Sequence, residues 1–162
     1  MKNPQSAVRS PQSSLTPLDY AYRLLAQRAY SEQELTDKLI AKGFTAPAVA
    51  RAIDRLKTQG YLDDTRLAAD QAERLRARGF GAEGIRTKLA QKGLSPDAVE
   101  HTREAGGEAE EIQSAQRFLA SRFSADALKE PQNHARAFRL LLRRGYSQEV
   151  VESLLGSALE DA

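Results

Sequence analysis

The chain has 162 residues, a formal charge of +2, 41% hydrophobic and 28% charged residues, and no cysteine. This composition indicates a globular protein, and the lack of cysteine excludes disulfides, thiolate metal sites and a cysteine nucleophile. No apolar run approaches the ~20 residues of a membrane-spanning helix, and the polar N-terminal segment has no signal-peptide core, so we expect no membrane association.

The chain is organised by a repeated turn of the form Lys/Arg-Gly-apolar. Before the repeats, residues 1–17 are rich in serine, proline and glutamine, and we expect them to form a disordered tail. The turn glycines stand at positions 43, 93 and 145, which are 50 and 52 residues apart, and this period indicates a tandem array. No stretch alternates as a strand would. The sequence therefore predicts an all-α protein in which three tandem three-helix repeats form an elongated, curved body. The predicted repeats span residues 18–62, 63–105 and 108–158.

The first predicted repeat contains clear helix boundaries. Ser31 begins the second helix, and Ser31 and Glu34 have the spacing of a capping box. Gly43 follows this helix where a left-handed residue is needed, and Thr45 is placed to cap the third helix. The residues predicted to face inward are Leu18, Ala21, Tyr22, Leu25, Ala29, Leu35, Leu39, Val49, Ala52, Ile53 and Leu56.

The second predicted repeat opens with two adjacent carboxylates, Asp63 and Asp64. They are candidate metal ligands, but no histidine or cysteine stands at ligand spacing, and aspartate before a helix caps it, so we predict capping. The first helix runs to about Arg78. The third helix is predicted to be short, because Arg103 stands where an apolar residue is expected. The predicted inward-facing residues are Leu67, Ala68, Ala72, Leu75, Ile85, Leu89 and Val99.

Two further features resemble catalytic or cofactor motifs. Gly79, Gly81 and Gly84 have the G-x-G-x-x-G spacing of a dinucleotide-binding loop, but no strand precedes them. We interpret them as a tight turn between helices, with a phosphate contact at Gly81 as the alternative. His101 and His134 have no partner at catalytic or metal-binding spacing, so we predict surface or capping roles. We therefore predict that the protein is not an enzyme and binds no cofactor.

The third predicted repeat follows a linker over residues 104–108. A connection over residues 124–133 leads to a second helix at about His134–Arg144, and Ser147 caps the last helix, which we expect to fray after Ala158. The predicted inward-facing residues are Ile112, Ala115, Leu119, Phe123, Ala137, Phe138, Leu141, Leu142, Val151 and Leu155.

Basic side chains are the remaining functional signal. Two lysines of the first repeat, one and five residues before its turn glycine, recur at the same places in the second repeat. Three arginines of the third repeat fall within about 60° of one another around their helix, opposite Phe138 and Leu142. A solvated face with internal ion pairs is the alternative, but the recurrence favours a shared surface that neutralises phosphates. The candidate residues are Lys38, Lys42, Arg74, Arg76, Arg78, Arg86, Lys88, Lys92, Arg136, Arg139, Arg143 and Arg144.

Four stretches of the sequence carry a family resemblance that covers about residues 18–157. They are Ser31-x-x-Glu34-Leu35-x-x-Lys38-Leu39-x-x-Lys42-Gly43-Phe44, Leu56-x-x-x-Gly60-Tyr61-Leu62-Asp63-Asp64-x-Arg66-Leu67-Ala68, Ile85-x-x-x-Leu89-x-x-Lys92-Gly93-Leu94 and Arg143-Arg144-Gly145-Tyr146-Ser147. In this order they resemble the RecX family of bacterial RecA regulators. Any single turn is unspecific, whereas the Gly-Tyr-Leu-Asp-Asp junction together with three Lys/Arg-Gly turns is specific.

The resemblance implies a non-catalytic regulator that binds the RecA–DNA filament and suppresses filament growth, ATP hydrolysis and strand exchange. It implies RecA as the partner, with single- or double-stranded DNA bound weakly or only together with RecA. Lys38, Lys42, Lys88 and Lys92 occupy motif positions, and we expect a cytoplasmic monomer. Two alternatives remain from the residues alone: a DNA-binding protein with helix-turn-helix-like units, and a helical-repeat adaptor for another protein.

Overall fold

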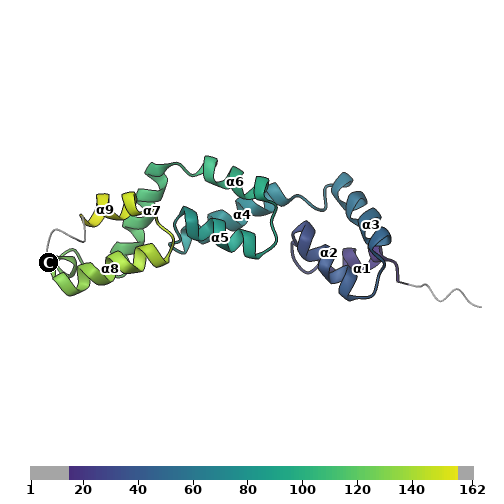
Figure 1. Cartoon of the computed structure of the whole chain (residues 1–162), viewed down its shortest axis with the longest axis horizontal. Coiled ribbons are helices and arrows are strands. Elements are labelled where there is room, and N and C mark those ends of the chain that lie inside the picture. Colours follow the sequence, from purple (N-terminus) through teal and green to yellow (C-terminus); the bar gives the residue numbers. More distant parts are fainter. Residues whose placement is uncertain (1–14, 157–162) are drawn as a thin grey trace, which may run out of the picture.

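The computed structural model describes residues 15–156, and all regular structure in that range is helical (Figure 1). The predicted all-α fold is confirmed. Residues 1–14 of the expected tail and the end expected to fray, 157–162, lie outside the described residues. Within the described range no helix is long and apolar enough to cross a membrane. The helices are α1 (Pro17–Leu25), α2 (Glu32–Ala41), α3 (Ala46–Thr58), α4 (Asp64–Ala77), α5 (Ala82–Gln91), α6 (Pro96–Ala105), α7 (Glu108–Ala120), the 3-10 helix η1 (Ala127–Lys129), α8 (Pro131–Arg143) and α9 (Gln148–Leu155).

Each group of three α-helices encloses its own hydrophobic core. Leu35, Leu39 and Leu56 are fully buried in the first group, Leu89 in the second and Leu141 in the third. The three groups follow one another along the long axis of an elongated body, as expected for tandem repeats (Figure 1). Because each repeat buries its own apolar residues, the repeats are joined mainly through helix ends rather than through one continuous core.

The caps of the first repeat differ in part from the prediction. The Ser31 hydroxyl accepts a hydrogen bond from the Glu34 N–H (3.1 Å), but the expected capping box is only half formed. The Glu34 carboxylate instead pairs with Arg28, whose hydrogen bonds lower the pKa of Glu34. A complete capping box forms at Thr16 and Asp19, ahead of α1.

Other local predictions also need correction or refinement. Thr45 is the N-cap of α3 but makes no side-chain cap hydrogen bond. Asp63 caps α4 by accepting from the backbone at Arg66 (2.9 Å), whereas Asp64 has a different role. Helix α6 has ten residues against thirteen in α3, its counterpart in the first repeat, so it is short as predicted. Thr102, one residue before Arg103, is buried and donates its hydroxyl to the Val99 carbonyl (2.7 Å).

Helix α8 begins three residues earlier than predicted. Pro131 takes the first helical position, where proline is tolerated because the N–H it lacks has no helical partner. Asn133 therefore lies inside the first turn, and its side-chain amide donates to Glu130 (2.8 Å). The His134 ring contacts the Leu155 carbonyl and so joins α8 to α9. Leu142, which we predicted to face inward, is 41% exposed.

The second and third repeats meet backbone to backbone. The Gly81 N–H donates to the Arg144 carbonyl (3.1 Å), and the Gly84 N–H contacts the Gly145 carbonyl (3.4 Å). A Cβ on Gly81 would lie 2.4 Å from the Tyr146 Cα, and a Cβ on Gly84 would lie 2.2 Å from the Arg144 carbonyl oxygen. The glycine spacing of this stretch thus serves close packing, and the Gly81 amide is already taken by a protein carbonyl rather than offered to a phosphate.

The first and second repeats meet through polar contacts. The Ser31 hydroxyl donates to the Lys92 carbonyl (2.8 Å). The Asp64 carboxylate accepts from the backbone N–H groups of Glu32 (3.0 Å) and Ser95 (3.4 Å), one in each repeat. Asp64 therefore links the start of α2 to the start of α6, where the helix dipoles favour a negative charge.

Both junctions use the same repeated turn. Turn 92–94 docks against the start of α2, and turn 144–146 docks against the start of α5, so that α2, α5 and α8 follow one another along the molecule (Figure 1). Turn 42–44 belongs to the first described repeat and makes no such contact between repeats, and a Cβ on Gly43 would find nothing within 4 Å among the described residues. The Lys/Arg-Gly turns of the second and third repeats are thus both helix ends and connectors between repeats.

Candidate functional site

Four of the candidate cations line one cleft between α4 and α5. Arg74 lies in the last turn of α4 and Arg78 is its C-cap, and Lys88 and Lys92 have the same positions at the end of α5. The cleft has a volume of about 600 Å³, and its remaining lining is apolar or amide-bearing. We call it the basic cleft. Its lining residues are Gln71, Arg74, Leu75, Ala77, Arg78, Lys88, Gln91 and Lys92.

The cations of the basic cleft are positioned but not neutralised. The Lys92 ammonium donates to the Gln71 side-chain carbonyl (3.1 Å), and the Lys88 ammonium lies 4.7 Å from the centre of the Phe80 ring. Among the described residues, none of the four cations of the cleft forms an ion pair. Their charges are therefore available to an external anion.

Three other candidates are engaged inside the molecule. Arg76 donates to the Thr102 carbonyl (2.7 Å), and its side chain is only 18% exposed. Arg86 is paired with Glu83, one turn earlier, and this hydrogen bonding lowers the pKa of the Glu83 carboxyl. Arg144 lies at the junction of the second and third repeats, and its contacts are structural. Its guanidinium donates to the Arg78 carbonyl (2.9 Å) and lies 4.6 Å and 4.8 Å from the Phe80 and Phe118 ring centres.

The first repeat presents its two candidate lysines at the C-terminal end of α2. Lys38 and Lys42 are both exposed. The Lys38 ammonium lies 5.8 Å from the Tyr30 ring centre, and the Lys42 ammonium lies 5.4 Å from that of Tyr20. Such cation–aromatic contacts orient the amines while leaving them accessible to solvent.

The third repeat presents its arginines in a different direction. Arg136, Arg139 and Arg143 are exposed on α8, and the first two line a shallow cleft at the start of that helix. The positions equivalent to Lys88 and Lys92 hold Leu140 and Arg144, so Arg139 and Arg143 stand one residue earlier, about 100° around the helix. The structure therefore brings together four of the six candidate cations of the second repeat but not all twelve candidates.

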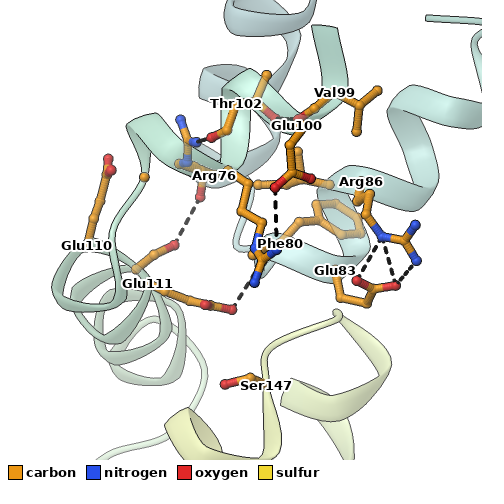
Figure 2. Close-up of a pocket in the computed structure, with 15 residues that line it drawn as sticks. Arg76, Phe80, Glu83, Arg86, Val99, Glu100, Thr102, Glu110, Glu111 and Ser147 are labelled. Atoms are coloured by element: carbon orange, nitrogen blue, oxygen red, sulfur yellow. Dashed lines mark hydrogen bonds and ion pairs between the residues drawn. The ribbon is translucent and has the colours of Figure 1, made fainter. Parts of the chain in front are cut away.

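A second cleft lies at the junction of the second and third repeats (Figure 2). It has a volume of about 460 Å³, and its lining mixes arginines with glutamates over an apolar floor. The Glu111 carboxylate accepts from the Ala82 N–H (3.1 Å) at the start of α5. The buried Ser114 and Tyr146 hydroxyls share a hydrogen bond (3.1 Å), and burial raises the pKa of Tyr146. These contacts hold the junction together, and no local pattern in the sequence pointed to them.

The histidines and the aspartate pair complete the list of candidates. His101 is exposed on α6, and His134 contacts a backbone carbonyl. Asp63 caps a helix and Asp64 bridges two repeats. Among the side chains that the structure describes, no group of three or more histidines, cysteines, aspartates or glutamates is arranged to hold a metal ion.

Comparison with known proteins places this architecture in a family. The family model described as RecX, first three-helix domain, matches residues 18–56. The regulatory protein RecX of Xanthomonas axonopodis pv. citri is 32% identical over 146 residues, which is 90% of each chain. The regulatory protein RecX of Chromohalobacter salexigens is 34% identical over 147 residues, covering 90% of this chain and 95% of the relative.

Solved structures show the same fold at lower identity. The crystal structure of RecX from Lactobacillus salivarius superposes with a TM-score of 0.72 at 15% identity, covering 88% of this chain and 94% of the other. A crystal structure of regulatory protein RecX superposes with a TM-score of 0.73 at 18% identity, covering 86% and 70%. With the repeated three-helix architecture and relatives 32% and 34% identical along 90% of its length, this chain belongs to the RecX family.

Proposed function

We propose that this protein is a non-catalytic regulator of the RecA recombinase that binds the RecA–DNA filament. In this proposal it suppresses filament growth, ATP hydrolysis and strand exchange. Membership of the RecX family supports the partner, and the relatives carry the name regulatory protein. The observation that carries the proposal is the basic cleft, because four cations without ion pairs among the described residues line one cleft and suit a phosphate backbone.

The elongated body suggests how inhibition would work. A filament offers the same binding surface at regular intervals, and a rod of linked repeats can contact more than one protomer. Simultaneous contacts raise the overall affinity beyond that of any single contact. A regulator bound in this way would hold neighbouring protomers together with their DNA and oppose the movements that accompany ATP hydrolysis. Lys38 and Lys42 would extend the contact along the first repeat.

The test measures ATP hydrolysis by RecA on single-stranded DNA. We expect the rate to fall as the protein is added, reaching strong inhibition at or below a one-to-one ratio to RecA. An unchanged rate at several-fold excess of the protein over RecA would refute the proposed function. Electron microscopy of the same mixtures separates shortened filaments from intact but inactive ones.

A second candidate function is DNA binding without RecA, and the basic cleft also favours it. This function predicts tight duplex binding that weakens steeply with salt, because each neutralised phosphate releases counterions. Fluorescence anisotropy with a labelled duplex distinguishes the two candidates. Tight binding of the duplex alone, together with no effect on RecA, would favour the second.

A further inference from the structure

A groove crosses the junction between the first and second repeats and differs in chemistry from the basic cleft. It has a volume of about 700 Å³ and lies between α2, α3 and the start of α6. Ile40 of α2 is 48% exposed at this groove, although it is a large aliphatic residue. We call it the junction groove. Its lining residues are Glu32, Gln33, Thr36, Ile40, Ala46, Val49, Ala50, Ile53, Asp54, Asp64, Gly93, Leu94, Ser95 and Pro96.

The charges of the junction groove disfavour a nucleic acid as its occupant. No lysine or arginine lines it, whereas cations line the basic cleft and the junction cleft of Figure 2. Its charged residues are Glu32, Asp54 and Asp64. Glu32 pairs with Lys57 (2.9 Å) and Asp64 accepts two backbone hydrogen bonds, so Asp54 is the carboxylate left without an ion pair among the described residues. A phosphate backbone is therefore disfavoured here, because the lining offers it carboxylates and no cationic side chain.

The shape of the groove suits a helix with one apolar face. Ala46 and Ala50 stand one turn apart on α3, and their small side chains allow a close approach of another element. Ile40 of the first repeat and Pro96 of the second are exposed and offer larger apolar contacts. A segment that fills such a groove presents apolar residues at three- and four-residue intervals. A lysine or arginine at its edge would pair with Asp54.

We propose that the junction groove is the protein-docking site of this regulator and receives an amphipathic, basic-edged helix of a RecA protomer. This inference rests on the proposed function and adds to it which surface meets protein and which meets DNA. Lys92 lines the basic cleft, and Gly93 and Leu94, the next two residues, line the groove. One turn therefore separates the two surfaces, and protein and DNA can be bound side by side.

The location also gives the docking a mechanical consequence. The groove takes Ile40, Val49 and Ile53 from the first repeat and Leu94 and Pro96 from the second. A helix bound there would bridge repeats that are otherwise linked mainly by a few polar hydrogen bonds. Occupation of the groove would therefore set the angle between the first two repeats when the protein lies on a filament.

Site-specific cross-linking tests the proposal. Because the chain has no native cysteine, a single introduced cysteine is the only one that can be labelled. Ile40→Cys and Leu142→Cys each carry a benzophenone label on an exposed aliphatic position, the second one outside the groove. On RecA filaments with single-stranded DNA and ATP, we expect at least about fivefold more cross-linking to RecA from position 40. Equal or greater cross-linking from position 142 would overturn the assignment of the groove.

A charge reversal provides the second measurement. Asp54→Lys should weaken binding to the RecA filament by tenfold or more and leave the affinity for a single-stranded oligonucleotide within about twofold. Asp37→Lys, on an exposed carboxylate outside the groove, is the matched control. If Asp54→Lys binds the filament with wild-type affinity, the groove is not the docking site, although the proposed function would still stand. A wild-type protein that leaves the RecA ATPase unchanged would overturn the proposed function and this inference with it.

Discussion

Glycine positions determine how closely the second and third repeats approach. Gly81 has φ of −79°, so its backbone conformation is open to any residue. The constraint is instead the absence of room for a Cβ beside the backbone of turn 144–146. A glycine of this kind cannot be recognised from local sequence, because the neighbouring backbone comes from a segment more than 60 residues away.

Gly81→Ala is therefore expected to lower the free energy of unfolding by about 1 to 3 kcal/mol, the range for overpacking a tight contact. Urea denaturation followed by circular dichroism measures the change. Gly107→Ala is the control, since a Cβ at Gly107 meets nothing within 4 Å and its φ of −55° suits alanine. Equal stability of Gly81→Ala and Gly107→Ala would contradict the role assigned to Gly81.

Tyr146 gives the same junction a dependence on alkaline pH. It is 3% exposed, and its burial raises the pKa of its hydroxyl, which also hydrogen-bonds Ser114. Because the folded pKa lies above the unfolded value of about 10, this term contributes full stability below pH 10 and is lost as the pH rises through the folded pKa.

We expect the melting temperature of the wild type to fall more steeply than that of Tyr146→Phe between pH 9 and pH 11. Scanning calorimetry over this range provides the comparison. Tyr61→Phe, at a tyrosine that is 58% exposed, is the control and should follow the wild type. Parallel curves for the wild type and Tyr146→Phe would show that the buried hydroxyl does not control the alkaline transition.

At the scale of elements, local signals in the sequence predicted where the helices lie, but they predicted the ends of the helices less accurately. Periodic apolar residues and the turn glycines located the nine α-helices of the described range. The predicted start of α8 was wrong by three residues. A proline such as Pro131 is equally typical of a connection and of the first position of a helix. The pairing of α4 with α5 then created the basic cleft from two separate i, i+4 pairs.

Lys88→Glu combined with Lys92→Glu should weaken binding of single-stranded DNA and of the RecA filament. If each lysine neutralises one phosphate, the plot of log K against log salt should become less steep, with the magnitude of its slope smaller by about 1 to 2. Fluorescence anisotropy at several salt concentrations measures this slope. Arg51→Glu combined with Arg55→Glu, on the exposed face of α3, makes the same change in net charge and should leave the slope unchanged.

The arginine stripe of α8 calls for a separate test. Arg136→Glu, Arg139→Glu and Arg143→Glu in one variant should reduce inhibition of the RecA ATPase without unfolding the chain. The three side chains are exposed, and the buried residues Ala137 and Leu141 of the same helix are untouched. Wild-type inhibition by this variant, with an unchanged circular dichroism spectrum, would remove the stripe from the binding surface.

The whole molecule has two junctions of different construction. The second and third repeats share backbone hydrogen bonds and close glycine contacts, whereas the first and second meet through Ser31 and Asp64. We therefore expect the angle between the first two repeats to be the more easily changed. This difference bears on function, because the basic cleft and the junction groove lie on either side of turn 92–94.

Asp64→Ala should loosen the first repeat and leave its core intact. Spin labels on Ala41→Cys and Ala90→Cys, both exposed positions, report the separation of the first two repeats. We expect double electron–electron resonance to show a broader distance distribution in Asp64→Ala. Asp63→Ala removes a helix cap but no contact between repeats, so it should keep the narrow distribution. Equal distributions in the two variants would mean that Asp64 does not hold the junction.

The sequence by itself determined the helices, their repetition and the family. These properties depend on residues within a few turns of one another, such as Leu35 and Leu39 on one face or Gly43 after a helix end. Only the tertiary structure decided which cations remain available. Arg74 and Lys88 meet in a cleft, whereas Arg76 and Arg144 are held by carbonyls of distant segments. Contacts between segments that are far apart in the chain leave no local pattern in the sequence. These contacts determine whether a basic residue is available for binding or is held in a structural role.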